Sequence, residues 1–483
     1  MKEKSLVKNS IYNVVYKFVN VIYPLITTMY ISHIFLADGV GKIASMQNIV
    51  QYFVMFASLG IPSYGIREIA KVRNNPEELN GIYSELLLIN AVATTACIVA
   101  FYSMVFCFDY FETNRSYYCV LGLNIVLNYL NIDWLFQGIE EYYYITKRNI
   151  IVKLTLLILI FVCIRDKDDL FLYLLLIVFA TAGNYIFNLY YSLKLGIRGR
   201  FLKCSVKNHI KPIVYLLCIT ISVELYTMID TTMMTFMCDA KCIGYYSSSI
   251  KMIKMIVTVV TAVSGVLLPR LSYYLKCNDF ESCKRLLTKA NNVLFVLVIP
   301  SVGGIFCIAD DLILIILGES FLPAALTMKL LSILIIIIGL SNLFTSQILM
   351  TYGAEKKIMF CTILGAVVNV VMNIILIPVL EQNGAAIASV IGEFIVMTMA
   401  FLCSRKYIKY KVDVSSLIKE IVGTVVMVLV IREINGAGIQ VLFRLFLELI
   451  IGVTVYFTTC FLLRNMVVID MLVSFLKINK QGE

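Results

Sequence analysis

Apolar runs long enough to cross a membrane recur about every 25 to 40 residues along the whole 483-residue chain. A helix needs about 20 residues to cross a hydrocarbon core of about 30 Å, and its backbone polar groups satisfy one another within the helix. Charged residues make up 15% of the chain, against roughly 25% in a soluble domain. The sequence therefore predicts an all-α polytopic membrane protein.

Fourteen transmembrane helices are expected from these runs. Their cores are residues 11–31, 43–66, 83–108, 117–137, 149–164, 170–193, 212–237, 244–268, 290–308, 325–350, 359–380, 385–403, 416–433 and 441–463. No loop between them exceeds about 20 residues, so the chain has no room for a soluble catalytic or nucleotide-binding domain.

The distribution of Lys and Arg indicates the orientation. If the N-terminus is cytoplasmic, the inside segments carry 29 of the 41 basic residues, the outside loops carry 6 and the spans carry the other 6. Short cytoplasmic loops of membrane proteins are enriched in Lys and Arg. We therefore expect both termini in the cytoplasm, and we interpret the net charge of +10 as a topology signal. Nucleic-acid binding is not expected.

Motifs for several kinds of chemistry are absent from the sequence. The 14 cysteines are scattered singly and there are only 2 histidines, so neither disulfides nor a metal site is expected. There is no GxxxxGKS or GxxxxGKT phosphate loop, so the chain is not expected to hydrolyse ATP. We expect no catalytic residues, no cofactor and no enzyme activity.

The chain contains an internal repeat. A segment starting at Gly41 aligns without a gap, over about forty residues, with one starting at Gly244. At this offset of 203, Arg67 aligns with Arg270, Asn75 with Asn278 and Glu78 with Glu281. At an offset of 215, Gly138 aligns with Gly353 and Glu140 with Glu355.

Each copy of the repeat contains six expected spans, an even number, so both copies have the same orientation in the membrane. We expect two six-helix lobes, residues 1–200 and 201–412, followed by two helices and a cytoplasmic tail in residues 413–483. Parallel repeats of this kind are related by an axis along the membrane normal, with the substrate site between the lobes. The stripe of Gly384, Ala388 and Gly392 predicts close packing of two helices.

Three stretches in the first half of the chain are distinctive. They are SLVKNSIYNVVYKFVNVIYPLITTMYISHIFLADGVGKIA, SLGIPSYGIREIAKVR and NIDWLFQGIEEYYYITKRNIIVKL. Together with the plan of six, six and two helices, they resemble the Wzx-type polysaccharide repeat-unit flippases of the multidrug/oligosaccharidyl-lipid/polysaccharide exporter (MOP) superfamily. The match covers helices 1 to 12 and is most specific through helix 6.

The resemblance implies a bacterial inner-membrane protein that works by alternating access. Its substrate would be an undecaprenyl-diphosphate-linked oligosaccharide, moved to the outer leaflet for capsule or O-antigen assembly. Membrane lipids, and possible contacts with the polysaccharide polymerase machinery, complete the expected partners.

Cations inside the expected spans suit such a substrate. Lys251 and Lys254 share one helical face in an apolar run, and Lys17 lies in the first span. A charge in hydrocarbon is costly, so a wet cationic cavity would assist the passage of a diphosphate. The alternative for the lysines is snorkelling to the interface. Arg67 and Arg270 are expected either to contact the diphosphate at the cytoplasmic side or to anchor the topology through salt bridges with Glu68 or Glu281.

Carboxylates also occur inside the spans. Glu224 is expected to pair with a cavity lysine, while Asp230 and Glu393 are candidates for either pairing or proton coupling. Two other transport functions stay open, and a membrane enzyme is disfavoured. A peptidoglycan lipid-precursor flippase has similar physics, a multidrug or cation antiporter would need an acidic cavity, and a membrane polymerase or glycosyltransferase would need a larger outside loop.

Overall fold

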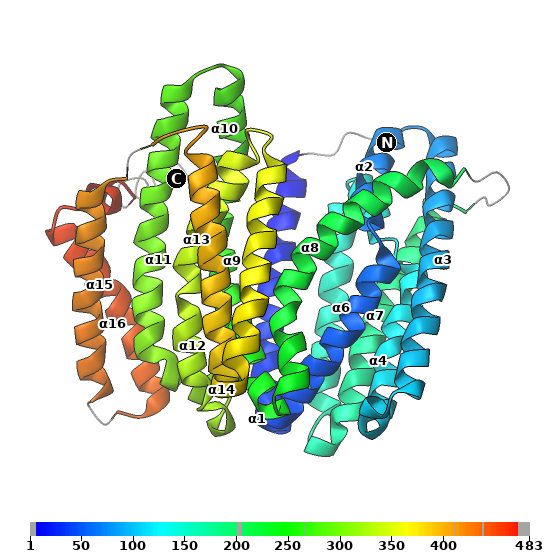
Figure 1. The fold of residues 1–483 in the computed structure, drawn as a ribbon, viewed down its shortest axis with the longest axis horizontal. Coiled ribbons are helices and arrows are strands. Elements are labelled where there is room, and N and C mark those ends of the chain that lie inside the picture. The colour runs from blue at the N-terminus through cyan, green and yellow to red at the C-terminus, as the bar shows by residue number, and fades with distance from the viewer. Residues whose placement is uncertain (1–5, 200–204, 266, 411, 437–438, 472–483) are drawn as a thin grey trace. The chain divides into compact units, whose positions relative to one another are not determined.

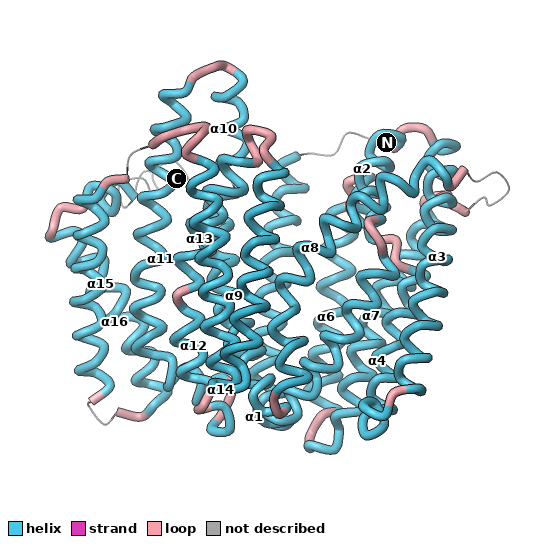
Figure 2. Tube along the Cα trace, viewed as in Figure 1, coloured by secondary structure: helices cyan, strands magenta, loops and turns pink. Residues whose placement is uncertain are grey.

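A computed structural model describes residues 6–199, 205–265, 267–410, 412–436 and 439–471. Within these ranges the chain is made of helices and loops and contains no strand (Figure 2). It divides into two compact units, Met1–Thr232 and Met233–Glu483, which are described separately. The division into lobes at residues 200 and 412 remains a prediction.

Among the described residues, the first unit contains seven complete α-helices and the second contains eight, with α8 crossing from one to the other (Figure 1). Those of the first unit are α1 (Leu6–Ser58), α2 (Ile61–Val72), α3 (Pro76–Cys107), α4 (Arg115–Leu127), α5 (Asp133–Gly138), α6 (Tyr142–Cys163) and α7 (Leu170–Lys194). They are followed by α8 (Lys207–Met237), α9 (Ala240–Gly265), α10 (Leu267–Lys276), α11 (Phe280–Ile316), α12 (Ala324–Ser332), α13 (Leu334–Asn342), α14 (Glu355–Ser404), α15 (Val414–Asn435) and α16 (Val441–Leu462).

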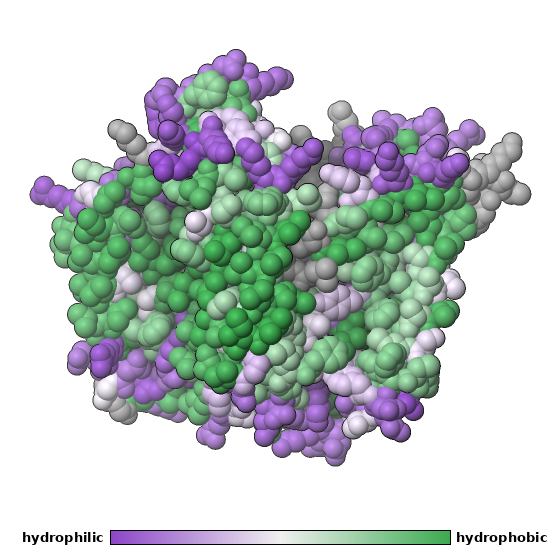
Figure 3. Space-filling model, in the orientation of Figure 1, coloured by the Kyte–Doolittle hydropathy of each residue, from purple (hydrophilic) through white to green (hydrophobic). Residues whose placement is uncertain are grey.

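Eight helical segments in the described part are long and apolar enough to cross a membrane. In both units apolar residues cover the middle of the helices and hydrophilic residues gather at their two ends (Figure 3). The structure therefore confirms an all-α, multi-pass membrane protein. The count of fourteen spans remains a prediction.

Two long helices each contain one residue with non-helical backbone angles. These residues are Leu36 in α1, with φ 56° and ψ −173°, and Glu381 in α14, with φ 49° and ψ −126°. The break at Leu36 falls between the expected spans 11–31 and 43–66, but it takes one residue rather than a loop. Each of the two helices is a pair of segments joined without a loop.

The expected stripe of small residues lies just after the break in α14. A Cβ on Gly384 would lie 2.3 Å from the carbonyl oxygen of Leu376, and one on Gly392 would lie 2.9 Å from Cβ of Asn369. Ala388 is fully buried. These distances confirm the predicted close approach: the second segment of α14 packs on the first through residues that have no bulk.

Short amphipathic helices, α2 and α10, occupy matching places in the two copies of the repeat. The helix after α2 is capped by Asn75, whose side chain accepts hydrogen bonds from two backbone N–H groups. The helix after α10 is capped by Asp279, and bonds from Ser282 lower the pKa of this carboxyl group. The caps are 279 − 75 = 204 residues apart rather than 203, and the ends of α2 and α10 are separated by the same 204 residues.

At a second helix end the alignment of the two repeat copies needs a larger correction. Glu140 and Gly353 both have left-handed backbone angles, with φ 58° and 67°. In each copy the next N–H, of Glu141 or Ala354, donates at 2.8 Å to the carbonyl five residues back, which is the Schellman ending of a helix. Glu140 thus corresponds to Gly353, at an offset of 353 − 140 = 213. The alignment of Gly138 with Gly353 is wrong by two residues.

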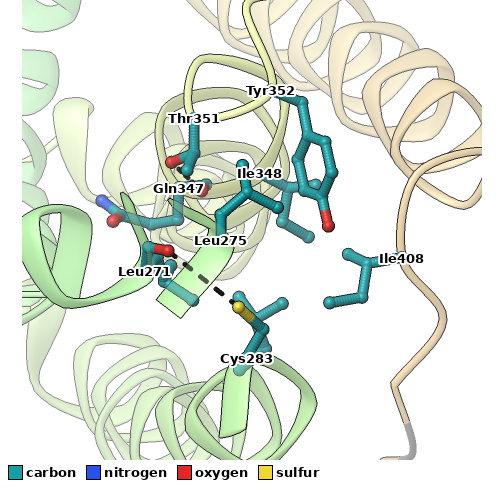
Figure 4. A pocket seen from close by; sticks show the side chains of 9 residues that line it. Leu271, Leu275, Cys283, Gln347, Ile348, Thr351, Tyr352 and Ile408 are labelled. Carbon is teal, nitrogen blue, oxygen red and sulfur yellow. Dashed lines mark hydrogen bonds between the residues drawn. The ribbon is translucent and has the colours of Figure 1, made fainter. Parts of the chain in front are cut away.

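The apolar face of α10 packs against α11 and the chain that leads into α14. Leu271 and Leu275 meet Cys283 and Tyr352 there, around a cavity of about 10 Å³ (Figure 4). A cavity of this size has room for about one water molecule. It is therefore a packing void between α10 and its neighbours and is too small for a sugar or a phosphate.

The packing of α2 on α5 leads to a prediction about stability. A Cβ on Gly65 would lie 2.5 Å from Cε3 of Trp134, whose side chain is buried. Gly65→Ala should therefore destabilise the protein by about 1–3 kcal/mol through overpacking. Gly81→Ala, in α3 with nothing within 4 Å of the added carbon, should stabilise it by about 0.5–1 kcal/mol. Thermal unfolding in detergent measures both, and equal effects of the two changes would contradict the packing described.

Candidate substrate-binding site

Helix α9 uses one face for packing and presents lysines on the other. Its buried stripe of Ser249, Ile253 and Val257 packs against α12, α13 and α14 of the same unit. At 100° per residue, Lys251 and Lys254 lie on roughly the opposite side of the helix. The lysine face is therefore separate from the buried stripe of the helix.

The two lysines differ in exposure and lie deep along the helix. Lys251 is half-buried, whereas Lys254 is exposed and its carbonyl accepts a 2.7 Å hydrogen bond from Thr258. The helix begins at Ala240 rather than near Gly244. At 1.5 Å per residue, Lys254 therefore lies roughly 21 Å from the start of α9, further than the sequence suggested. This depth argues against snorkelling to the near interface.

The other cations inside the expected spans are engaged in contacts. Lys329 forms a 2.5 Å ion pair with Asp310, Arg444 binds both carboxylate oxygens of Asp311, and the ammonium of Lys153 lies 5.0 Å from the ring centre of Tyr23. For Lys254 no ion pair occurs among the described residues. The side chain of Lys17 lies outside the described residues.

The arginines of the repeat lie on the amphipathic helices. Arg67 on α2 and Arg270 on α10 are exposed. Arg67 contacts Glu68 at 3.2 Å, as the anchoring alternative predicts, whereas Glu281 pairs with Lys284 at 2.7 Å. Both arginines thus remain reachable from solvent, and their role in substrate contact is a proposal.

The three candidate carboxylates occupy different surroundings. Asp230 on α8 is buried, while Glu224 on α8 and Glu393 on α14 are half-buried. Two residues beyond Asp230, the hydroxyl of Thr232 accepts a 2.6 Å hydrogen bond from Asn48 and lies 2.7 Å from the hydroxyl of Tyr52. Asp230 therefore lies beside a polar contact that joins α8 to α1.

A buried charged cluster in the first unit was missed by sequence reasoning. Arg148 on α6 donates to Asp133 on α5 at 2.7 Å and also to Asn188 on α7. Asn188 donates in turn to Asp133 at 2.5 Å. The sequence count had placed Arg148 among the cytoplasmic loop cations, yet only 6% of its side chain is exposed. Its spacing from Asp133 was the available signal, but pairing across a turn is not visible in a hydropathy pattern.

Fold and site together define a helical membrane transporter with two lysines on one face of a long helix. The sequence matches the family model described as polysaccharide biosynthesis protein over residues 6–275, and the model described as lipid II flippase MurJ over residues 149–472. The chain belongs to the polysaccharide biosynthesis protein family, in its Wzx-type branch of the MOP superfamily, and it is related to the MurJ flippases through the second match.

Individual relatives agree with this placement. The chain is 21% identical to the "Putative O-antigen transporter" of Escherichia coli (strain K12), over 83% of this chain and 97% of the relative. It is 22% identical to the lipid II flippase MurJ of Bacillus subtilis (strain 168), over 40% of this chain and 34% of the relative.

Solved structures share the fold. A structure of the lipid II flippase MurJ in an inward closed conformation matches with a TM-score of 0.77 and 14% identity, over 96% of this chain and 99% of that one. An inward-facing multidrug MATE transporter of the MOP superfamily matches with a TM-score of 0.63 and 13% identity, over 80% of this chain and 93% of that one. At these identities the likeness concerns the fold.

Proposed function

We propose that this protein flips an undecaprenyl-diphosphate-linked oligosaccharide from the cytoplasmic to the outer leaflet of a bacterial inner membrane, for capsule or O-antigen assembly. The observation that carries the proposal is the lysine face of α9, which lies opposite the buried stripe of that helix. Such a face is costly in lipid but suits an anionic head group. Lysine serves as a point-charge binder of phosphate.

Alternating access between two lobes is the proposed mechanism. The prenyl chain would stay in the bilayer while the diphosphate and the sugars pass along Lys251 and Lys254. Lys17 is a further candidate for the same path. Arg67 and Arg270 would make the first contact on the cytoplasmic side. Asp230, Glu224 and Glu393 would then balance the lysines or couple the movement to protons, and the polymerase machinery would receive the product.

Complementation distinguishes this function from its nearest alternative. The match to the MurJ model makes lipid II the second candidate substrate. In a strain without its own repeat-unit flippase, expression of this chain with its matching glycosyltransferases should restore surface polymer. It should not restore growth to a strain depleted of its lipid II flippase. The opposite pattern would replace the oligosaccharide by lipid II.

A multidrug antiporter is disfavoured by the positive charge of the candidate site. Cationic drugs require an acidic pocket, whereas α9 presents two lysines at mid-helix. Export of a cation such as ethidium should therefore be unchanged by expression of this chain, and a gain in drug resistance would revive the antiporter.

The membrane potential should drive the transport. Moving one charge is worth about 2.3 kcal/mol per 100 mV, so two negative charges leaving an inside-negative cell gain about 4.6 kcal/mol. In proteoliposomes that carry the lipid-linked substrate, collapse of the potential at a constant pH gradient should therefore stop net export. Unchanged export would show that another gradient drives the transport.

A further inference from the structure

A cavity of about 430 Å³ lies among α9, α11, α15 and α16 of the second unit. Helices α11, α15 and α16 are side by side there (Figure 1). Its walls are almost entirely apolar, and two wall positions are glycines, Gly304 and Gly452. A Cβ on Gly304 would meet only Met427, at 3.9 Å. The volume is that of a small-molecule site.

The cavity opens onto the apolar outer surface of the second unit. Leu449 and Val453 line it, yet these residues are 47% and 55% exposed. In a membrane this surface meets hydrocarbon chains, so the occupant must come from the lipid phase. The cavity therefore selects an occupant with an apolar part.

Three lining side chains carry polar groups, but the hydroxyl groups of Ser301 and Tyr456 donate to backbone carbonyls. The third is a carboxyl group. Glu448 is 1% exposed, and neither of its carboxyl oxygens has a hydrogen-bond partner among the described residues. Arg444, one turn before it on α16, is already bound to both oxygens of Asp311. A buried carboxyl group without a partner is costly, so a donor or a cation supplied by the occupant would satisfy it.

Glu448 lies at one end of the cavity. It is seven residues after Val441, roughly 10 Å along the helix, whereas the lining at Tyr456 lies about 12 Å further. In the orientation predicted from the basic residues, Val441 is at the outer face. The polar end of the cavity therefore points toward the outer head groups and the apolar end toward the middle of the bilayer.

We propose that this cavity binds one outer-leaflet aminophospholipid, with its primary ammonium group on Glu448 and an acyl chain along α11 and α16. Charge selects this head group. The phosphate of an anionic lipid would face the carboxyl group without a compensating cation. A choline head group has no N–H to donate to it. The site is separate from the lysine face of α9 and does not depend on the transported substrate.

Lipid binding to the full-length purified protein tests the proposal without a transport assay. The probes are dioleoyl phosphatidylethanolamine and dioleoyl phosphatidylcholine, titrated in detergent and quantified by native mass spectrometry. The wild type should bind the ethanolamine lipid at least about tenfold more tightly, the ratio expected for one hydrogen bond to a charged group. Glu448→Gln should bring the two lipids close to parity.

Two further variants keep the result interpretable. Glu433→Gln removes a carboxylate from an exposed position near the end of α15 and should keep the wild-type preference. Gly304→Leu fills the cavity and should weaken both lipids while leaving Glu448 in place. Equal binding of the two lipids by wild type, or an undiminished preference in Glu448→Gln, would overturn the proposal.

Discussion

Replacing Lys254 by Glu should reduce surface polymer at least about a hundredfold, and replacing it by Ala about tenfold, in cells that depend on this protein for export. The smaller factor corresponds to the loss of one charge-assisted hydrogen bond. The larger one adds repulsion of a diphosphate by a carboxylate near the middle of the membrane. Lys254 is exposed and lies opposite the packed face of α9, so neither change should unfold the protein.

The matched control for this prediction lies on the same helix. Lys241, in the first turn of α9, is exposed, and Lys241→Glu makes the same change of charge outside the proposed path. Polymer output and the amount of folded protein in the membrane are measured for all three variants. Wild-type output from both Lys254 variants would remove this residue from the mechanism.

Replacing Arg148 by Met should lower the free energy of unfolding by about 2–3 kcal/mol. Loss of one partner of a buried ion pair costs about 3–5 kcal/mol, and this range is reduced because 39% of the Asp133 side chain is exposed. The change leaves Asp133 and Asn188 without the donor that joins α5, α6 and α7. Thermal unfolding in detergent should show the loss as a lower Tm.

The neighbouring residue provides the control for Arg148. Lys147 is exposed, so Lys147→Met removes the same charge from the same turn of α6 without breaking a buried contact. Its Tm should stay within about a degree of wild type, since surface charges contribute little. If both variants unfold at the same temperature, the Arg148 cluster does not stabilise the first unit.

Hydropathy and charge predicted the class of fold because they express one strong constraint. Backbone groups in lipid must form hydrogen bonds within helices, and the side chains of those helices must be apolar. Long apolar runs in the sequence follow from this requirement. The same constraint does not specify how successive helices join. A single non-helical residue, Leu36 or Glu381, replaces a loop in this structure, and such a break carries no hydropathy signal.

The repeat was detected at the right places but in the wrong register at its helix ends. Asn75 and Asp279 perform the same capping task in different sequence positions, and Glu140 has the left-handed conformation that Gly353 has in the second copy. Alignment by residue type favours positions that carry identical residues. Backbone geometry tolerates different residues where a cap or a turn needs the same shape.

The candidate site was predictable to the level of the helix face and no further. The spacing of Lys251 and Lys254 placed them together, and the structure adds that their face lies opposite the buried stripe of α9. The partners of Arg148, Lys329 and Arg444 could not be read from the sequence, because each ion pair joins different elements. A cation in a span is thus a weak indicator of function until its neighbours are known.

Direct translocation in proteoliposomes tests the central claim most sharply. The purified full-length protein is reconstituted with a fluorescent undecaprenyl-diphosphate-linked oligosaccharide, and its arrival in the opposite leaflet is followed with an impermeant quencher under an imposed potential. The wild type and Lys241→Glu should move the lipid at equal rates, whereas the double variant Lys251→Glu/Lys254→Glu should move it no faster than empty liposomes. Equal rates for the wild type and the double variant would contradict the role proposed for the lysine face.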